Sequence, residues 1–454
     1  MAEIIPFRGM RYNPAKVGDL SKVMAPPYDV ISGEKQDDLY SRHPNNIIRL
    51  ILRKKKEAGA PQDEAYGEAA VEMASWIRDG VLVRDARPAI YYYAQTYALP
   101  DGRTQCRRGF IALARLEEFG KGRIHPHEKT LSGPKADRLK LMLKCNANLS
   151  AIFSLYSDHS LETNKILNER VKGLTPVIDV VDDDGIVNTM WRIEDAAVIK
   201  KVEALMKDKP LFIADGHHRY ETALNYRELK LKEEKNPTGS EPYNYVMMYF
   251  SNMDDEGMTI WPTHRIVHGI EGFNADKFLG ECGGYFDVEA IGYDAGNEKA
   301  QRAFFINKIE AQGKSATTFG LKMRGKSAFY VLTLKSGDVM DKVFGGKIPE
   351  VFKSLDVTVL HSLILSNILG ITAEAQETQR NIIYVKKADE AIAAVTDEKN
   401  QLAFILNPTK IEQVESVAET GLVMPQKSTY FYPKLLSGLV QNIHALSFPD
   451  PACT

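Results

Sequence analysis

Residues Leu211–Leu224 have the sequence LFIADGHHRYETAL. The first residues form an apolar run and the last have the apolar spacing of a helix, so the pattern predicts a buried strand, a polar turn and a helix. The turn, Asp215 to Arg219, brings one carboxylate, two imidazoles, one guanidinium and a glycine together. The first amides of a helix are unpaired donors that bind anions. We therefore expect this turn to be the centre of an active site.

The composition is that of an ordinary folded protein. The chain has 454 residues, which predicts two or three domains, and its 44% hydrophobic content is enough to form cores. With 58 basic and 60 acidic residues the net charge is −2, so no overall field attracts nucleic acid or anionic lipid. The four cysteines are far apart and form no CxxC pair, which predicts free thiols in the cytoplasm. Neither a signal peptide nor a membrane span is expected.

Helix and strand patterns mix in the N-terminal part. Apolar residues recur at helical spacing over residues 61–78. Two β-like runs, residues 89–97 and 107–114, flank the turn sequence Pro-Asp-Gly at 100–102, which predicts a hairpin. We expect an α+β protein, with a mixed sheet and helices in residues 1–270 and an α/β part in residues 271–454.

Residues 25–31 read APPYDVI, and the two prolines force an extended path before Tyr28 and Asp29. Such a rigid segment can direct a side chain into a cleft. A surface turn between two elements explains the same residues equally well.

A second polar segment reads IHPHEKTLSGPKADR. The proline between His125 and His127 disfavours a helix, so both imidazoles and Glu128 are predicted on an extended or loop segment ahead of a helix. A carboxylate near Lys135 and Arg138 suits a general base beside phosphate-binding cations. A solvated charged loop is the structural alternative.

The C-terminal part contains a tract of prolines, hydroxyls and aromatic residues. Lys427, Ser428 and Thr429 offer one cation and two hydroxyls, a composition suited to phosphate or carboxylate oxygens. An ordinary proline-rich loop would look similar. We expect this part to fold back so that residues 425–434 reach the site.

Residues 320–327 read GLKMRGKS and match the phosphate-loop pattern GxxxxGK[ST]. A phosphate loop must open a helix, whereas the residues that follow, AFYVLTL, form a β-like run. A hairpin turn is therefore the better prediction.

Three blocks, residues 123–131, 211–224 and 402–430, resemble the free L-serine kinases of the ParB/sulfiredoxin-like superfamily. The whole chain resembles a large bacterial family of unassigned function that carries ADGHHRYETAL and APPYDVI. The first 120 residues have no counterpart in the kinase. The resemblance implies a ParB/sulfiredoxin-like core and a phosphotransferase that moves a phosphoryl group from ATP or ADP to the hydroxyl of free L-serine or a similar metabolite, with Mg²⁺.

The resemblance also implies roles for individual residues. Glu128 takes the role of general base, and Asp215 holds Mg²⁺ directly or through water. His217, His218 and Arg219 stabilise the transferring phosphoryl group. The predicted nucleotide- and phosphate-binding residues are Gly216, His127, Lys135 and Arg138, and the predicted substrate-binding residues are Lys427, Ser428 and Thr429.

Two other functions stay open. In a metallohydrolase, Zn²⁺ or Mn²⁺ would be held by His125, His127, Asp215, His217 and His218 and would activate water. A sensor would bind a nucleotide or an amino acid without turnover. In each case the expected partners are small molecules rather than nucleic acid or membrane, and a homo-oligomer is left open.

Overall fold

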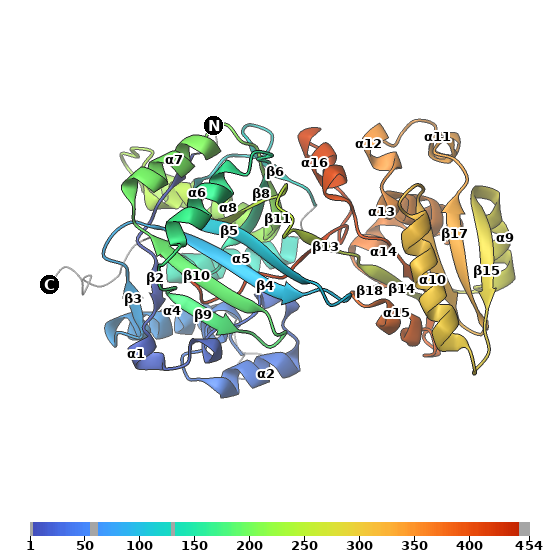
Figure 1. The fold of residues 1–454 in the computed structure, drawn as a ribbon, viewed down its shortest axis with the longest axis horizontal. Helices are drawn as coiled ribbons and strands as arrows, with labels where there is room; N and C mark the ends of the chain where they lie inside the picture. Colours follow the sequence, from blue (N-terminus) through green and yellow to red (C-terminus); the bar gives the residue numbers. More distant parts are fainter. Residues whose placement is uncertain (1–2, 55–61, 129–131, 445–454) are drawn as a thin grey trace. The chain divides into compact units, whose positions relative to one another are not determined.

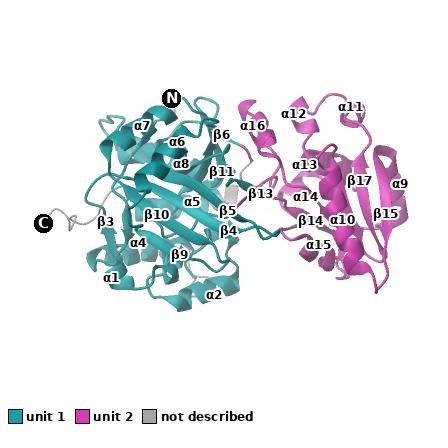
Figure 2. Cartoon of the chain, viewed as in Figure 1, with its two compact units in different colours: residues 1–126, 130–259, 433–454 teal, residues 127–129, 260–432 magenta. Residues whose placement is uncertain are grey.

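The computed structural model describes residues 3–54, 62–128 and 132–444 (Figure 1). It contains two compact units (Figure 2). Unit 1 comprises Met1–Pro126, Thr130–Thr259 and Pro433–Thr454, and unit 2 comprises His127–Lys129 and Ile260–Tyr432. Both units combine helices with a sheet, so the predicted α+β class is confirmed.

Unit 1 is built on a mixed sheet that has nine strands among the described residues. In spatial order the first eight are β6 (Ile124–Pro126), β11 (Leu211–Asp215), β8 (Ile152–Tyr156), β12 (Tyr245–Asn252), β5 (Thr104–Arg115), β4 (Ile90–Ala98), β10 (Val187–Ile193) and β9 (Ile178–Val181), and β1 (Ile4–Ile5) pairs with β5. The pairs β6–β11 and β8–β12 are parallel, and the other pairs are antiparallel. The predicted hairpin is the β4–β5 pair.

The helices of unit 1 take part in two cores. They are α1 (Pro14–Val17), α2 (Gly33–Arg42), α3 (Ile48–Ile51), α4 (Gln62–Arg78), α5 (Ser132–Cys145), α6 (Glu162–Val171), α7 (Ala196–Met206) and α8 (His217–Glu233). One core joins α6, α7 and α8 to the side chains of alternate strand residues such as Phe110 and Ala112. A second core joins α2, α3 and α4 to one side of α5. The helix predicted over 61–78 is therefore confirmed as α4.

The last described residues of the chain belong to unit 1. The segment that begins at Pro433 pairs with Ala25 through Ser437 and with Met10 through Gln441. It ends in the short pair of β7 (Ala147–Asn148) with β21 (Asn442–Ile443). Residues more than 400 positions apart in the sequence, such as Ala25 and Ser437, therefore lie side by side in one unit.

Unit 2 contains an antiparallel sheet, six-stranded among the described residues. Its order is β15 (Phe286–Gly292), β17 (Ala328–Leu334), β16 (Thr318–Met323), β19 (Asn400–Ile405), β14 (His264–His268) and β18 (Ile382–Val385). Strands β16 and β17 are paired neighbours, so the sequence GLKMRGKS lies in a hairpin and is no phosphate loop, as predicted.

The helices of unit 2 bury both faces of its sheet in two separate cores. They are α9 (Ala275–Tyr285), α10 (Glu298–Gln312), α11 (Asp338–Phe344), α12 (Glu350–Lys353), α13 (Asp356–Val359), the π-helix Leu360–Ile368, α14 (Ala373–Glu377), α15 (Ala388–Ala394) and α16 (Ile411–Glu419). After α16 the chain forms the loop that carries Lys427 and then β20 (Tyr430–Tyr432).

Candidate active site

Gly216 shapes the turn between β11 and α8. Its φ angle is +94°, in the left-handed region that glycine adopts readily. A Cβ atom at this position would lie 2.8–2.9 Å from three side-chain atoms of Arg219. Glycine therefore supplies both the backbone conformation and the space that lets Arg219 fold back over the turn.

Asp215 lies at the centre of a cluster of cationic groups in unit 1. Its Oδ2 accepts a hydrogen bond of 2.7 Å from Nη2 of Arg219, and its Oδ1 accepts one from Nζ of Lys434. Burial alone would raise the pKa of this carboxyl, but the charges of Lys434 and Arg219, with a smaller contribution from His217, hold the pKa well below its usual range. His217 is buried and His218 is half-buried in the same first turn of α8. The carboxylate is therefore ionised in a locally cationic environment.

Two side chains hold Lys434 in place by binding the backbone carbonyls of Pro433 and Lys434. Arg107, only 1% exposed, donates from Nη2 to the Pro433 carbonyl at 2.5 Å, and Gln95 donates to the Lys434 carbonyl at 3.0 Å. The guanidinium carbon of Arg107 is 4.4 Å from the ring centre of Phe153. No sequence motif marks Lys434, because its partner Asp215 is 219 positions away.

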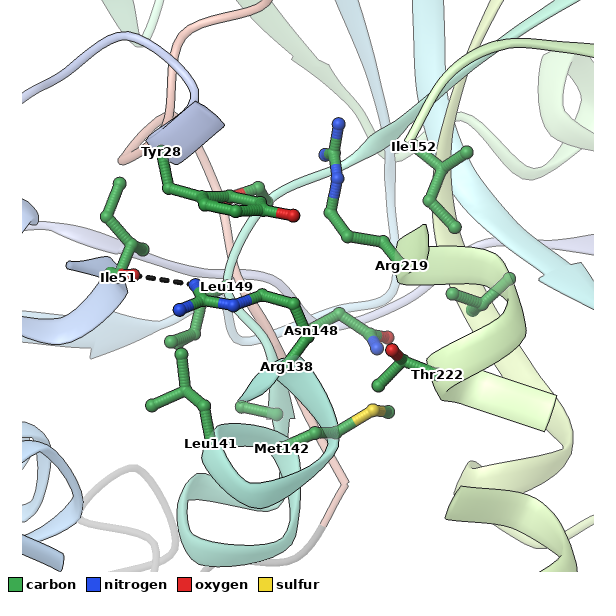
Figure 3. Close-up of a pocket in the computed structure, with 13 residues that line it drawn as sticks. Tyr28, Ile51, Arg138, Leu141, Met142, Asn148, Leu149, Ile152, Arg219 and Thr222 are labelled. Atoms are coloured by element: carbon green, nitrogen blue, oxygen red, sulfur yellow. Dashed lines mark hydrogen bonds between the residues drawn. The ribbon is translucent and has the colours of Figure 1, made fainter. Parts of the chain in front are cut away.

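Arg219 and Arg138 line the same cavity in unit 1, together with Tyr28 (Figure 3). The cavity has a volume of about 60 Å³. Lys135, one turn before Arg138 on α5, instead forms an ion pair of 2.5 Å with Glu221 of α8. Of the two α5 cations predicted to bind phosphate, Arg138 therefore faces a cavity and Lys135 joins two helices.

Glu128 is fixed by Thr429 within unit 2. The backbone amide and the hydroxyl of Thr429 both donate to Oε1 of Glu128 at 3.2 Å. Nε2 of His127 is 2.8 Å from the same hydroxyl, and the imidazole is 1% exposed against the edge of Phe431. The Met424 amide donates to the His127 carbonyl at 2.7 Å, which anchors this backbone. If Nε2 of the imidazole donates to the Thr429 hydroxyl, this hydroxyl can in turn donate its hydrogen bond to the Glu128 carboxylate. Each of the three side chains then has a hydrogen-bond partner.

Ser428 and Lys427 lie in the loop that presents Thr429. The Ser428 hydroxyl donates to the Pro425 carbonyl at 2.6 Å, and the Ser428 carbonyl accepts from Thr409 at 2.7 Å. Lys427 has a φ angle of +57°, unusual for a residue with a side chain. The Lys427 carbonyl accepts a hydrogen bond of 3.0 Å from Arg265. In this arrangement the Ser428 hydroxyl stabilises the loop itself.

Arg265 is a second buried cation that no motif marks. It is 1% exposed, and burial lowers its pKa to about 10, although the charges of Tyr384 and Glu128 act in the opposite direction. It therefore contributes positive potential at Glu128 while its hydrogen bond to Lys427 fixes the loop.

Among the described residues, no three His, Cys, Asp or Glu side chains gather in a group that could hold a metal ion. Each carboxylate oxygen of Asp215 already accepts from a cationic side chain. In the arrangement seen here Asp215 therefore does not fit the role of metal ligand, and Mg²⁺ stays a prediction.

The fold and these clusters define an α+β protein with buried, charge-paired polar sites. The chain belongs to the family DUF1015, described as "Protein of unknown function", whose model matches residues 4–358. No curated protein matches the chain.

Solved structures give low-similarity matches. A conserved hypothetical protein from Pyrococcus furiosus is 14% identical with a TM-score of 0.30, covering 68% of this chain and 87% of that one. A free serine kinase variant in complex with ADP is 10% identical with a TM-score of 0.32, covering 68% and 84%. A C-terminally truncated SbnI from Staphylococcus aureus is 10% identical with a TM-score of 0.34, covering 72% and 85%. In the described part of the chain, no helix combines the length and the apolar character needed to cross a membrane.

Proposed function

We propose that this protein is a phosphotransferase that moves a phosphoryl group from ATP or ADP to the hydroxyl of free L-serine or a similar small metabolite. The observation that carries the proposal is the fixed carboxylate of Glu128, the residue that the resemblance to free L-serine kinases makes the general base. A base must be oriented before it can take a proton from the attacking hydroxyl. The two hydrogen bonds from Thr429, backed by His127, provide that orientation.

The cluster around Asp215 supports the phosphate-binding half of the proposal. Phosphoryl transfer is catalysed mainly by positioning and by charge stabilisation. Arg219 and Lys434 keep positive charge at the start of α8, where the helix amides also favour an anion. We assign His217, His218 and Arg219 to the transferring phosphoryl group, with Asp215 holding the cations in place.

The reaction is balanced without further reactants. The acceptor oxygen forms a bond to the terminal phosphorus of the donor, and the bond from that phosphorus to the bridging oxygen breaks. The hydroxyl proton passes to Glu128, and the donor leaves as the nucleotide shortened by one phosphoryl group. Thr429, with Lys427, is the candidate for positioning the acceptor.

The test is ³¹P NMR of the purified protein with L-serine, Mg²⁺ and either ATP or ADP. We expect O-phosphoserine with at least one donor, formed about 100-fold or more slowly by Glu128→Gln, since general bases typically contribute factors of this size. Glu203→Gln on α7 is the matched control, because it removes a partly buried glutamate outside the cluster, and it should leave the rate unchanged.

Two outcomes would reject the proposal. The first is that no phosphoserine forms with either donor, in which case nucleotide binding without product would favour the sensor. The second is equal turnover by wild type and Glu128→Gln, which would remove the base. No observation favours the metallohydrolase, because its five predicted ligands do not appear as a metal-binding group among the described residues.

A further inference from the structure

The cavity lined by Tyr28, Arg138 and Arg219 has the properties of a binding site in its own right (Figure 3). Its described lining contains two guanidinium groups and no carboxylate, and each guanidinium is paired with an aspartate outside the lining, Asp137 for Arg138 and Asp215 for Arg219. The polar lining also includes Asn148, Ser150 and Thr222, and the apolar lining includes Ile51, Leu141, Met142, Leu149, Ile152 and Val246. All of these residues belong to unit 1.

Arg138 is oriented by neighbours on two sides. Its Nη1 donates to the Ile51 carbonyl at 2.7 Å, its Nε donates to Asp137 at 2.7 Å, and its side chain is only 10% exposed. Arg219 is oriented in the same way by Asp215 and by the Ala151 carbonyl. Each guanidinium has five N–H donors, so these contacts leave donors for a ligand. Two fixed guanidinium groups are typical of sites that bind a carboxylate or phosphate.

Tyr28 completes the site from the N-terminal segment APPYDVI. Pro27 has an extended backbone, and Tyr28 begins a single 3-10 turn directly after it. The guanidinium carbon of Arg138 is 4.2 Å from the centre of the Tyr28 ring, and the hydroxyl points toward Arg219 (Figure 3). The two prolines thus direct the Tyr28 side chain into a cavity. This arrangement agrees with the functional interpretation of the APPYDVI segment rather than with a surface turn.

The size of the cavity limits what it can hold. Its volume of about 60 Å³ is well below the roughly 150 Å³ of a cavity that accommodates benzene, and a water molecule occupies about 30 Å³. A nucleobase is therefore too large. The carboxylate end of a small acid fits both this volume and the chemistry of the lining. The apolar wall formed by Leu141, Met142 and Ile152 suits an aliphatic carbon better than a second phosphate oxygen.

We infer that this cavity binds the carboxylate of a short hydroxy or amino acid, with Tyr28, Arg138 and Arg219 around the carboxylate and Thr222 near the hydroxyl or amine. The inference concerns binding alone: the cavity shares Arg219 with the proposed phosphotransferase site, and a binding test without nucleotide can succeed or fail separately from that proposal.

The test is isothermal titration calorimetry of the full chain, without nucleotide, against glycolate, L-lactate, L-serine and inorganic phosphate. Arg138→Lys keeps the charge but loses the planar fork and should weaken carboxylate binding about 10- to 100-fold, as expected for a charge-assisted hydrogen bond. Tyr28→Phe should weaken it about 2- to 10-fold, as for a neutral hydrogen bond.

The matched controls are Arg49→Lys and Tyr40→Phe, since Arg49 lies 4.6 Å from the Tyr40 ring in a similar pair that does not line the cavity. Both controls should bind like wild type, and circular dichroism should show all four variants folded. The inference is wrong if none of the carboxylates binds, or if the control variants weaken binding as much as the cavity variants. Tighter binding of phosphate than of any carboxylate would overturn the ligand class.

Discussion

Replacing Lys434 by methionine should destabilise unit 1, because Asp215 would lose one of its two cationic partners. The side chains of Lys434 and Asp215 are each only 15% exposed, so solvent screens their interaction weakly. The Arg219 pair, at 2.7 Å, would remain. Methionine keeps the length and most of the apolar contact of lysine, so the change reports mainly on the charge.

The expected loss is about 2 kcal/mol at neutral pH. A hydrogen bond to a charged group contributes about 1.5–3 kcal/mol, and stripping a buried charge of its only partner costs about 3–5 kcal/mol. Because Asp215 keeps Arg219 as a partner, the expected loss of stability lies in the lower of these two ranges. Because the pKa of Asp215 is depressed in the folded protein, its contribution to stability is present above the carboxyl pKa of the unfolded chain, about 4, and is lost as the pH falls below it. The difference between wild type and variant should therefore shrink between about pH 4 and pH 2.

The assay is urea unfolding followed by tryptophan fluorescence in a Trp261→Phe background. Of the three tryptophans, Trp76 and Trp191 lie in unit 1 and Trp261 in unit 2, so this background reports on unit 1 alone. A double-mutant cycle with Asp215→Asn isolates the pairwise energy.

Lys172→Met is the control for this experiment, since Lys172 pairs with Glu169 on the surface with both side chains at least 70% exposed. It should change the free energy of unfolding by less than about 0.5 kcal/mol. The argument fails if the coupling between Lys434 and Asp215 is below about 0.5 kcal/mol, or if the destabilisation is the same at pH 7 and at low pH.

Two further predictions concern single residues. Gly216→Ala should destabilise unit 1 by more than about 1 kcal/mol in the same assay, because its φ angle is +94° and the new Cβ would meet Arg219. Gly67→Ala is the control: a Cβ at this position inside α4 would have nothing within 4 Å, so the substitution should stabilise the unit by about 0.5–1 kcal/mol. Equal effects of the two substitutions would contradict the explanation. Burial raises the pKa of Asp356 to about 7. The protonated side chain therefore contributes its full stabilisation below the unfolded-state pKa of about 4. As the pH rises from about 4 to about 7, the free energy of unfolding declines by up to about 1.4 kcal/mol per pH unit. Asp356→Asn should remove this slope, which urea unfolding monitored by Trp261 fluorescence would measure, and an unchanged slope would contradict the assignment.

The parts of the fold that follow from neighbouring residues could be predicted from the sequence. The turn at residues 100–102 gives the β4–β5 hairpin, and the helical spacing over residues 61–78 gives α4. The β-like run after GLKMRGKS correctly excluded a phosphate loop. Each of these depends on a pattern within about twenty residues, where turn chemistry and periodicity decide the structure.

Contacts between residues that are far apart in the sequence have no such local pattern. The hydroxyl of Thr429 contacts Glu128 across 301 positions, and nothing in the neighbouring sequence indicates that partner. Tyr28 could be a surface turn or part of a cleft, and only the packing of Arg138 against its ring distinguishes the two. The residue types at these positions were informative, but their partners depend on tertiary structure.

Lys434 illustrates why the cationic cluster was only partly predictable. A lysine after a proline usually points into solvent, and nothing near Lys434 in the sequence indicates otherwise. What distinguishes it is a polar pair in the middle of the sheet, where Gln95 lies directly opposite Arg107 and both are buried. Burying such a pair costs free energy that apolar residues of similar volume would not. Since both side chains bind the backbone at Pro433 and Lys434, the pair explains how a distant segment delivers its ammonium group to Asp215.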